Sequence, residues 1–494
     1  MGAAARYPHR PAIIDERGSV SFADLDMRTN ALANALAGRG IRSGQRVAVM
    51  CRNHRGFIEA SVACSKLGVD ALYLNTSFAG PQVTEVVGRE DPVAVVFDEE
   101  FASLVREACE GRLAVMADTE NSDGAGANGH ASVSTLEELI AGSSRRTPPA
   151  PERAGRTVIL TSGTTGTPKG ANRPSPSSLQ PAAALLSRIP LRAREPTFIA
   201  APMFHSWGFA HLVLAPLLGS TIVVRRRFDP LGSLEAVAQH RATALVVVPV
   251  MLQRMLELDS DTLEALDTSS LRVIAASGSA LPGPLASRVM DTFGDKLYNL
   301  YGSTEVAWAT IAGPEDLRLA PGTAGRPPRG TAVKVFDDDW HEASTGVSGR
   351  IFVGSEMLFE GYTGGGDKDR HGALMATGDV GHFDQHGLLF VDGRDDDMIV
   401  SGGENVFPAE VEDLLATVPG VREVAVVGVP DDEFGQRLRA FVAREGDTAP
   451  TEEQLKDAVR SNLAGYKVPR EVLFLDQLPR NATGKILKRT LARD

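Results

Sequence analysis

Hydrophobic and polar positions in the first half of the chain alternate between two periods. From Ser21 to about Arg39, apolar residues recur near helical spacing, which predicts a helix capped by the Ser21 hydroxyl. The mostly apolar run 46–50 that follows has the length of a buried strand. Repeated alternation of this kind predicts parallel α/β sheets. Further strands are predicted at 11–14, 70–74, 93–97, 197–200, 221–224, 244–248 and 272–276, and helices at about 56–67 and 81–90.

The pattern changes twice in the second half of the chain. Between about 324 and 361, short apolar runs alternate with glycine turns, which predicts a small β-barrel-like or antiparallel part. After Arg394, helices at 408–418 and 452–463 alternate with strands at 423–429, 438–443 and 472–474, as in an α+β domain. Because 494 residues exceed what one compact core accommodates, we predict two domains, 1–394 and 395–494.

Composition narrows the class of protein. A net charge of −12 without a basic face argues against general nucleic-acid binding. The three cysteines lack metal-ligand spacing, which suits a protein of a reducing compartment. We identify neither a signal peptide nor a membrane span in the sequence, so we expect a cytoplasmic location. The basic triplet 225–227 attracts an anionic membrane by only about 1 kcal/mol per charge, which favours a solvated turn. A weak peripheral membrane contact and a homodimer stay open.

A loop rich in glycine and hydroxyl residues follows the apolar run 158–160. Its glycines permit positive φ, its N–H groups and hydroxyls donate hydrogen bonds, and a lysine adds positive charge, so the loop suits a polyphosphate. A flexible linker has a similar composition but needs neither the lysine nor the preceding strand. The spacing does not fit a Walker loop, in which Gly-Lys precedes Ser or Thr. The candidate phosphate-binding residues are Thr161, Ser162, Gly163, Thr164, Thr165, Gly166 and Lys169.

Four further motifs carry polar residues next to glycine turns. The motif 298–305 is predicted to end a strand and turn at Gly302, and it offers Glu305 as a hard oxygen ligand for Mg²⁺. In the motif 376–381, Asp379 is placed to accept from both hydroxyls of a ribose. Gly393 and Arg394 precede an acidic tract, which by itself is typical of a solvated linker. Near the C-terminus, a turn at Gly484 would project Lys485, although most terminal lysines are solvated.

Taken together, the order and spacing of these motifs resemble the adenylate-forming superfamily over essentially the whole chain. This superfamily includes acyl- and aryl-CoA synthetases, firefly luciferase and the adenylation domains of peptide synthetases. Within it, the segments 298–306, 377–383 and 393–412 look most like those of a fatty-acyl-CoA ligase. The resemblance implies a large N-terminal domain of α/β sheets and a small, mobile C-terminal lid. It also implies ATP, Mg²⁺ and coenzyme A as cofactors.

The resemblance also implies a role for each motif. The loop 161–169 would hold the ATP phosphates, with Thr304 on the phosphate and Glu305 on Mg²⁺. Lys485 would bridge the substrate carboxylate and the α-phosphate. Asp396 matches the position about which the lid rotates. The residues implied in the remaining nucleotide site are Ser277, Gly278, Ser279, Ala280, Asn299, Tyr301, Gly302 and Ser303, with Asp379 and Arg394 on the ribose, Asn405 near AMP, and Gly402 and Gly403 along the pantetheine tunnel.

The acyl side is placed by the same resemblance in the segment 201–209. His205 would sit near the substrate carboxylate, although core packing explains a buried histidine as well. No Asp lies between 201 and 214, where amino-acid-activating relatives bind the substrate ammonium, so an amino acid is disfavoured. The many Ala, Val and Leu residues suggest an aliphatic chain, and a medium- or long-chain fatty acid is the expected substrate. The other candidate pocket residues are Trp207, Gly208, Phe209, Val248 and Trp308.

Several other readings of the sequence stay open. An aryl- or bile-acid-CoA ligase, and a fatty-acyl-AMP ligase that feeds a carrier protein, differ in substrate or acceptor. A luciferase-like oxygenase shares the first half-reaction, because fold alone does not fix the second. A non-catalytic nucleotide sensor is disfavoured by the joint presence of Glu305, Asp379, Arg394 and Lys485. We assign no chemistry to the glycine insert 364–366.

Overall fold

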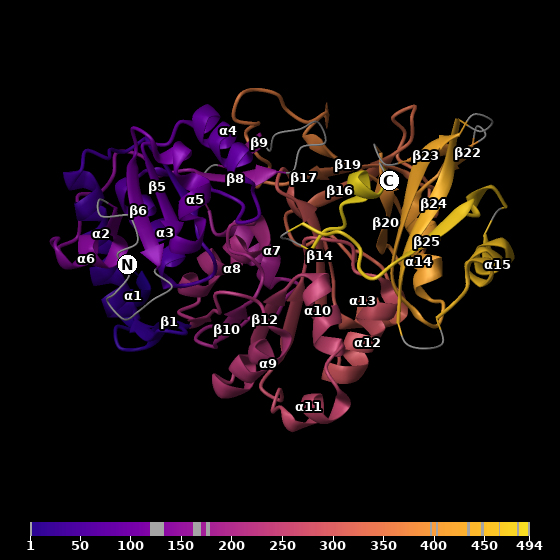
Figure 1. Ribbon diagram of the computed structural model, residues 1–494, viewed down its shortest axis with the longest axis horizontal. Helices are drawn as coiled ribbons and strands as arrows, with labels where there is room; N and C mark the ends of the chain where they lie inside the picture. Colours follow the sequence, from indigo (N-terminus) through magenta and orange to yellow (C-terminus); the bar gives the residue numbers. More distant parts are fainter. Residues whose placement is uncertain are drawn as a thin grey trace. The chain divides into compact units, whose positions relative to one another are not determined.

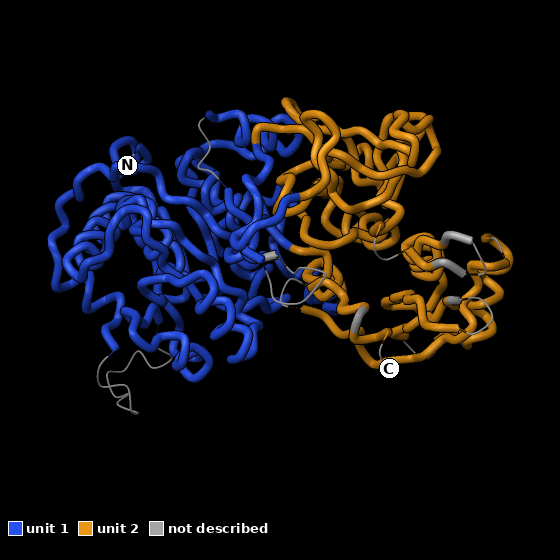
Figure 2. Tube along the Cα trace, turned by 90° about the horizontal axis from the view of Figure 1, so that it is seen from above, with its two compact units in different colours: residues 1–247, 257–275, 357–367 blue, residues 248–256, 276–356, 368–494 orange. Residues whose placement is uncertain are grey.

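The chain is described by a computed structural model that comprises two compact units (Figures 1 and 2). One unit contains residues 1–247, 257–275 and 357–367, and the other contains residues 248–256, 276–356 and 368–494. The division predicted from the sequence, into domains 1–394 and 395–494 with a lid that pivots near Arg394, stays a prediction. The structure describes residues 2–118, 133–161, 169–173, 178–395, 398–401, 404–431, 435–445, 449–463, 465–481 and 484–492.

The first unit contains a sheet in the strand order β7-β6-β5-β3-β4-β8-β9, parallel except for β9. Apolar side chains of its strands and of helix α4 form a buried core, as expected for strands covered by crossover helices. The bounds are β3 Arg46–Met50, β4 Asp70–Tyr73, β5 Ala94–Asp98, β6 Leu113–Asp118, β7 Ser134–Thr135, β8 Thr157–Thr161 and β9 Lys169–Arg173, with α2 Phe22–Gly38, α3 Arg55–Leu67, α4 Gly80–Glu90, η1 Glu99–Phe101, α5 Ala102–Val105, η2 Glu107–Cys109 and α6 Leu136–Ala141.

The same unit contains a second run of strands in the order β13-β12-β10-β11-β1-β2, parallel from β12 to β1. The predicted α/β alternation is therefore confirmed, and the Ser21 hydroxyl caps α2 by accepting from the Asp24 N–H at 3.1 Å. The bounds are β1 Pro11–Asp15, β2 Gly18–Ser21, β10 Thr197–Ile199, β11 Ile222–Val223, β12 Ala244–Val247 and β13 Val273–Ala276, with α1 Gly2–Arg6, α7 Gln180–Leu186, α8 Ser206–Leu217, α9 Pro230–Gln239 and α11 Ser260–Ala265.

The second unit contains the hairpin of β14 and β15 and an antiparallel sheet in the order β16-β17-β19-β18, with β20 also paired to β19. The β-rich pattern after residue 324 is thus confirmed as an antiparallel sheet. The bounds are β14 Leu297–Ser303, β15 Ala307–Ala312, β16 Ala332–Phe336, β17 Gly349–Gly354, β18 Arg370–His371, β19 Leu374–Phe383 and β20 Leu389–Arg394, with α10 Pro249–Leu256, α12 Gly283–Phe293 and α13 Pro314–Leu319.

The C-terminal part of this unit is the predicted α+β fold. Helices α14 and α15 pack Val411, Leu415, Leu455 and Val459 against apolar strand residues such as Val426. Strands run in the order β22-β21-β24-β23, and β25 adds to β24 in parallel. The bounds are β21 Ile399–Ser401, β22 Glu404–Val406, α14 Pro408–Ala416, β23 Val421–Asp431, β24 Gly435–Arg444, α15 Glu452–Asn462, η3 Gly465–Lys467, β25 Glu471–Leu475 and α16 Lys488–Leu491.

The basic triplet after β11 lies in a partly exposed bend, as predicted, but two of its arginines also form ion pairs that the sequence did not predict. Arg226 and Arg227 each place a guanidinium nitrogen 2.9 Å from the Glu100 carboxylate, which Arg52 also contacts at 2.8 Å.

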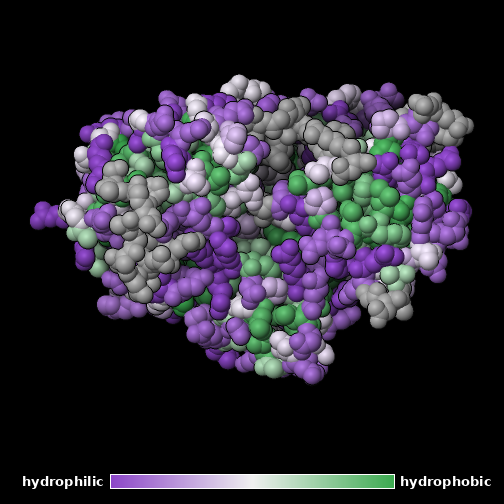
Figure 3. All heavy atoms as spheres, in the orientation of Figure 1, coloured by the Kyte–Doolittle hydropathy of each residue, from purple (hydrophilic) through white to green (hydrophobic). Residues whose placement is uncertain are grey.

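Hydrophilic residues cover much of the face drawn in Figure 3, in line with the net charge. Within the described residues, none of the helices combines the length and apolarity that a bilayer crossing requires.

Candidate active site

The phosphate loop predicted from the sequence connects the two strands of an antiparallel hairpin. Strand β8 ends at Thr161 and β9 begins at Lys169, and these two residues are paired in register. The strand predicted before the loop is confirmed. The candidate residues Ser162, Gly163, Thr164, Thr165 and Gly166 lie outside the described residues.

A carboxylate, a phenol and a guanidinium meet in the second unit. Asp379 in β19 pairs in register with Arg394 in β20, and an Arg394 nitrogen lies 3.5 Å from the Asp379 carboxylate. The Tyr301 hydroxyl donates to the other carboxylate oxygen at 2.6 Å. Two sequence-predicted ribose residues are therefore brought together, and Tyr301 joins them from β14.

The charge of Asp379 is balanced by several neighbours. Burial raises the pKa of this carboxyl, while the Tyr301 hydrogen bond and the positive charges of Arg394, Lys485 and Lys368 lower it. Burial and the nearby Asp379 charge raise the pKa of the Tyr301 phenol well above its ordinary value, so this phenol stays protonated as a donor. The site therefore presents an acceptor carboxylate among cations.

The geometry next to the Asp379 carboxylate explains why residue 378 is a glycine. Its φ is +83°, and a Cβ there would lie 3.2 Å from the Lys368 ammonium and 3.4 Å from an Arg394 nitrogen. Any side chain would thus be strained and would crowd two cations of the site. The glycine before Asp379 keeps these groups close to the carboxylate.

The hairpin of β14 and β15 corrects the predicted turn at Gly302. Strand β14 continues to Ser303, and the turn comes at 304–306, with a register shift between Tyr301 and Gly302. A Cβ at Gly302 would lie 1.8 Å from the Ala307 carbonyl oxygen. Glycine is therefore required for close cross-strand approach rather than for a turn, which a sequence pattern does not distinguish.

Residues of this hairpin present polar atoms that protein groups leave unsatisfied. Among the described residues, the buried Asn299 Oδ1 and Trp308 Nε1 have no hydrogen-bond partner. A buried acceptor without a partner is costly, and an amino group such as that of adenine would satisfy Asn299. The Ser303 hydroxyl accepts from the Glu305 N–H at 3.2 Å and shapes the turn that carries Thr304 and the buried Glu305.

The turn after β13 contains the remaining predicted adenine residues. Ser277 is buried, and Gly278 has a φ of +98° with its Cβ position 3.4 Å from Val248. Ser279 and Ala280 continue this turn at positions that are partly or fully exposed. The structure therefore brings one predicted pocket residue, Val248, next to the predicted nucleotide turn.

The C-terminal lysine follows the predicted tight turn. Gly484 has a φ of +79° and donates its N–H to the Asn481 carbonyl at 2.9 Å, while the Lys485 N–H is bound by the Asn481 side chain at 2.9 Å. A Cβ at Gly484 would lie 2.3 Å from Val250 Cγ1. The turn thus packs closely on α10, and Lys485 acts electrostatically on Asp379.

Four predicted lid residues are described in part or not at all. Asp396, Gly402 and Gly403 lie outside the described residues. For Asn405 the structure gives the backbone in β22. Their implied roles therefore stay predictions.

The predicted acyl segment forms the start of α8 in the first unit. His205 is the N-cap residue, and burial lowers its pKa to about 4. Its Nε2 has no hydrogen-bond partner among the described residues. The Trp207 indole donates to the Val247 carbonyl at 3.1 Å, and Phe209 packs 5.0 Å from Tyr73. Gly208 allows close approach, since a Cβ there would lie 2.4 Å from the Pro202 carbonyl oxygen.

Sequence reasoning missed His211 on the same helix. This buried imidazole lies edge-on to Trp207 with ring centroids 4.5 Å apart, and its Nε2 also lacks a hydrogen-bond partner among the described residues. Burial lowers its pKa to about 3, so it is neutral at ordinary pH. Its spacing of four residues from Trp207 was the available signal.

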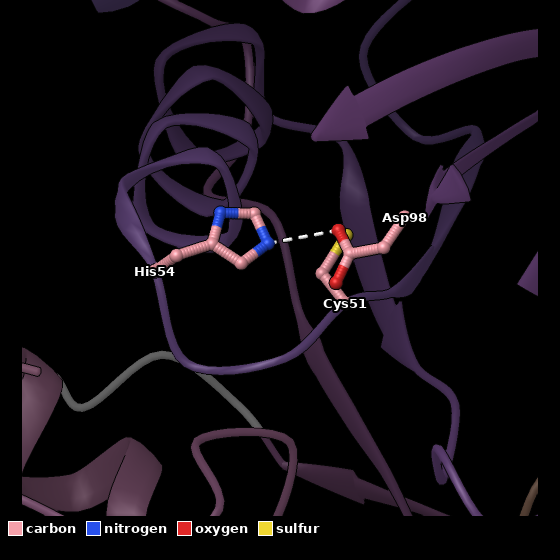
Figure 4. A group of neighbouring side chains, drawn as sticks. All are labelled: Cys51, His54 and Asp98. Atoms are coloured by element: carbon pink, nitrogen blue, oxygen red, sulfur yellow. Dashed lines mark hydrogen bonds and ion pairs between the residues drawn. The ribbon is translucent and has the colours of Figure 1, made fainter. Parts of the chain in front are cut away.

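A second missed group is the buried cluster of Cys51, His54 and Asp98 (Figure 4). The His54 Nε2 lies 2.8 Å from Asp98, and its Nδ1 accepts the Gly56 N–H as the N-cap of α3. Because Nδ1 accepts, Nε2 must carry the proton that it donates to Asp98. A metal ion would need the Nε2 lone pair, so we interpret this cluster as a structural cap.

Two family models match this chain, one in each of two separate segments. Residues 2–363 match the family model described as AMP-binding enzyme, and residues 410–485 match the AMP-binding enzyme C-terminal domain. An indoleacetate–CoA ligase of Aromatoleum aromaticum is 32% identical, over 98% of this chain and 95% of its own length. The long-chain-fatty-acid–CoA ligase FadD13 of Mycobacterium tuberculosis is 30% identical, over 96% and 92%.

Solved structures give the same picture. The o-succinylbenzoate CoA synthetase of Bacillus subtilis, in complex with its acyl-adenylate, has a TM-score of 0.85 and 27% identity, over 99% of this chain and 97% of that chain. The chain therefore belongs to the AMP-binding enzyme family, in the CoA-ligase branch of the adenylate-forming superfamily. The family resemblance and the expected fold class are confirmed.

Proposed function

We propose that this protein converts a carboxylic acid and ATP into an acyl-adenylate and then into an acyl-CoA thioester, with release of pyrophosphate and AMP. The observation that carries the proposal is the group of Tyr301, Asp379 and Arg394 with the charge of Lys485 acting on the same carboxylate. Adenylate formation requires a group that binds the nucleotide, for which we propose Asp379 at the ribose. It also requires a cation near the reacting groups, for which we propose Lys485.

Adenylate formation brings two anions together. The substrate carboxylate must approach the α-phosphate of ATP, so electrostatic repulsion is the main obstacle. In this proposal Asp379 and Arg394 would bind the ribose, the loop 161–169 would bind the phosphates, and Lys485 would neutralise charge between the reacting groups. Loss of Lys485 is expected to cost about 2.7–4 kcal/mol of transition-state stabilisation, as for a lost oxyanion donor.

The residues present suit the nucleotide and its metal ion. The unsatisfied Asn299 acceptor fits an adenine amino group. The buried Glu305 carboxylate, on the turn that also presents Thr304, is a hard oxygen donor of the kind Mg²⁺ prefers. When bound, the ion would supply charge neutralisation at the phosphates. Ser277 and Gly278 would complete the adenine pocket.

The second half-reaction needs the CoA thiol where Lys485 had been. We propose that the segment 395–494 rotates about Asp396, so that Gly402 and Gly403 replace Lys485 beside the adenylate, with Asn405 near AMP. Residues 1–394 would then be the adenylation core. A cytoplasmic location is part of this proposal, because ATP and CoA are cytoplasmic substrates.

For the acid, we propose a medium- or long-chain fatty acid. The support is the apolar character of the acyl segment, in which Trp207 and Phe209 would flank the acyl tunnel, and the similarity to a long-chain-fatty-acid–CoA ligase. An aryl acid is the second candidate. Two observations favour it: the neutral, unsatisfied imidazole of His211 beside Trp207, and the similarity to an indoleacetate–CoA ligase.

The test is a pyrophosphate-release screen over straight-chain acids of graded length and over arylacetic, cinnamic and benzoic acids, with and without CoA. A fatty-acid ligase should gain activity with chain length, and CoA should be consumed in equal amount to AMP formed. Activity confined to the aromatic acids would replace the fatty-acid proposal. Adenylation without CoA consumption would indicate a carrier-protein acceptor. Absence of turnover with every acid would indicate a nucleotide sensor.

A further inference from the structure

A segment distant in sequence lies along the open edge of the phosphate hairpin. We define residues 359–366, which belong to the first unit, as the strap. Strand β9 is the last strand of its sheet, so one of its edges is available for pairing. The strap occupies this edge directly beside Lys169, where the phosphate loop ends.

Backbone hydrogen bonds pair the strap with β9. The Asn172 N–H donates to the Gly361 carbonyl at 3.1 Å, and the Asn172 carbonyl accepts the Glu360 N–H at 3.0 Å. Closer to the loop, the Thr363 N–H donates to the Gly170 carbonyl at 2.7 Å. The strap therefore acts as an additional antiparallel strand, with Ala171 opposite Tyr362.

Thr363 anchors this pairing to the core. Its hydroxyl accepts the Gly170 N–H at 3.2 Å and donates to the Glu90 carboxylate at 2.5 Å. Glu90 is fully buried at the end of α4 and is paired with Arg46 at 2.9 Å. A Cβ at Gly170 would lie 2.6 Å from the Thr363 hydroxyl, so only glycine permits this approach.

Tyr362 contacts the lysine of the phosphate loop. The Lys169 ammonium lies 5.5 Å from the centre of the Tyr362 ring, within the range of a cation–π interaction. The ring is held edge-on by the buried Phe359, with centroids 4.8 Å apart. The rigid Tyr362 ring therefore restricts the flexible Lys169 side chain before any ligand binds. Without this contact, Lys169 would lose more rotamer freedom when it binds a ligand.

The glycine insert closes the strap behind Tyr362. The Tyr362 N–H donates to the Gly366 carbonyl and its carbonyl accepts the Gly365 N–H, both at 3.1 Å. Gly364, Gly365 and Gly366 all have positive φ. The insert, for which the sequence offered no account, therefore makes the tight loop that fixes the backbone of Tyr362.

We propose that the strap is a working part of the triphosphate site, in which Tyr362 positions the Lys169 ammonium and Thr363 anchors the hairpin, and that it sets the affinity for the polyphosphate of ATP. This inference rests on the phosphate-binding role proposed for the loop. Tyr362 is a positioning residue that acts through Lys169. Its removal should weaken the binding of ATP and leave the binding of the acid unchanged.

The decisive variants are Tyr362→Leu and Tyr362→Phe, each also made in a Lys169→Ala background. The readouts are the KM for ATP and for the acid in pyrophosphate exchange, and the affinity for inorganic tripolyphosphate measured by calorimetry. Tyr362→Leu should weaken tripolyphosphate and ATP binding about two- to fivefold, the effect of one exposed cation–π contact. Tyr362→Phe, which keeps the ring, should retain most of the affinity. In the Lys169→Ala background, Tyr362→Leu should have no further effect.

Two variants of Thr363 and one control variant separate positioning from folding. Thr363→Val removes the hydroxyl but keeps the shape, and it should lower both the melting temperature and the tripolyphosphate affinity, whereas Thr363→Ser should restore both. Phe474→Leu is the matched control, because Phe474 lies 4.1 Å from the Arg444 guanidinium in the C-terminal sheet. This control should bind tripolyphosphate as the wild type does.

The outcomes that overturn the inference are distinct from those that overturn the function. An equal effect of Tyr362→Leu with and without Lys169, or a rise in the KM of the acid alone, would refute the positioning role. A wild-type protein that does not bind tripolyphosphate would refute it too. If the protein binds tripolyphosphate but exchanges pyrophosphate with no acid, the proposed function fails while the coupling of Tyr362 and Lys169 is still measured.

Discussion

Replacing Asp379 by Asn should separate nucleotide binding from stability. The change keeps the shape of the side chain and an acceptor for the Tyr301 hydroxyl, which lies at 2.6 Å. It removes the negative charge that pairs with Arg394 and that we propose accepts from the ribose. A hydrogen bond to a charged group is worth about 1.5–3 kcal/mol, and because Asn still accepts we expect a total loss equal to about one such bond, so kcat/KM for ATP should fall about 10- to 150-fold.

The same change should leave the melting temperature equal or raise it. Burial raises the pKa of Asp379, which means that the folded protein holds the ionised form less readily than the unfolded chain does. For a carboxyl with a raised pKa, stability is lost as pH rises above the unfolded value near 3.8 toward the folded value. At neutral pH the wild type carries this penalty in full, and Asn does not.

The assay is pyrophosphate exchange with ATP, 2′-deoxy-ATP and 3′-deoxy-ATP, using whichever acid the screen identifies. The wild type should lose affinity when either hydroxyl is removed, and Asp379→Asn should lose much less, since its hydroxyl contacts are already weakened. Equal losses in both proteins would mean that Asp379 does not bind the ribose. Tyr301→Phe is the control that leaves the carboxylate in place.

Three further predictions concern other parts of the molecule. Lys485→Ala should lower pyrophosphate exchange about 100- to 1,000-fold yet still form thioester from supplied acyl-AMP. Asp396→Pro should do the reverse, and equal loss of both half-reactions in both variants would refute the two-pose proposal. Burial lowers the pKa of His211 to about 3, so this residue should cost about 1.4 kcal/mol of folding stability for each pH unit below the unfolded value near 6.5. His211→Leu should therefore reduce the fall in melting temperature between pH 7 and pH 5, and the remaining fall should include the contribution of His205, whose pKa is lowered to about 4. His54→Ala should lower stability by about 1.5–3 kcal/mol in thermal melts, while a chelator should leave the wild-type melt unchanged; a rise in melting temperature with zinc would contradict the assignment as a cap.

Local pattern predicted most elements because the reasons for them are local. The Ser21 cap, the buried run at β3 and the α+β pattern after Arg394 were each readable from a few neighbouring residues. Gly302 was misread because a glycine in a turn and a glycine under a cross-strand carbonyl look the same in one dimension. The difference depends on Ala307, which lies on the other strand of the hairpin.

The site shows the same limit at longer range. Asp379 and Arg394 were predicted as a pair, and their register in adjacent strands confirms that they meet. The phenol of Tyr301 on Asp379 and the hydroxyl of Thr363 on Glu90 were not predicted, because each joins residues far apart in sequence. No periodicity encodes such contacts, and only the fold brings these side chains together.

The charges around Asp379 also bear on how an acidic protein could bind the anion that we propose as its substrate. The chain has a net charge of −12, yet Arg394, Lys368 and Lys485 all act on one carboxylate that is only partly exposed. Cations therefore outnumber the carboxylate they surround, and in a partly desolvated site their attraction is weakened less by water than at the surface. In the function proposed above, Asp379 would hold these cations near one another, and the excess positive charge would be available to the phosphates. This carboxylate relieves part of the repulsion among the cations and serves as an acceptor, but its raised pKa shows that the cost of burying it exceeds that gain.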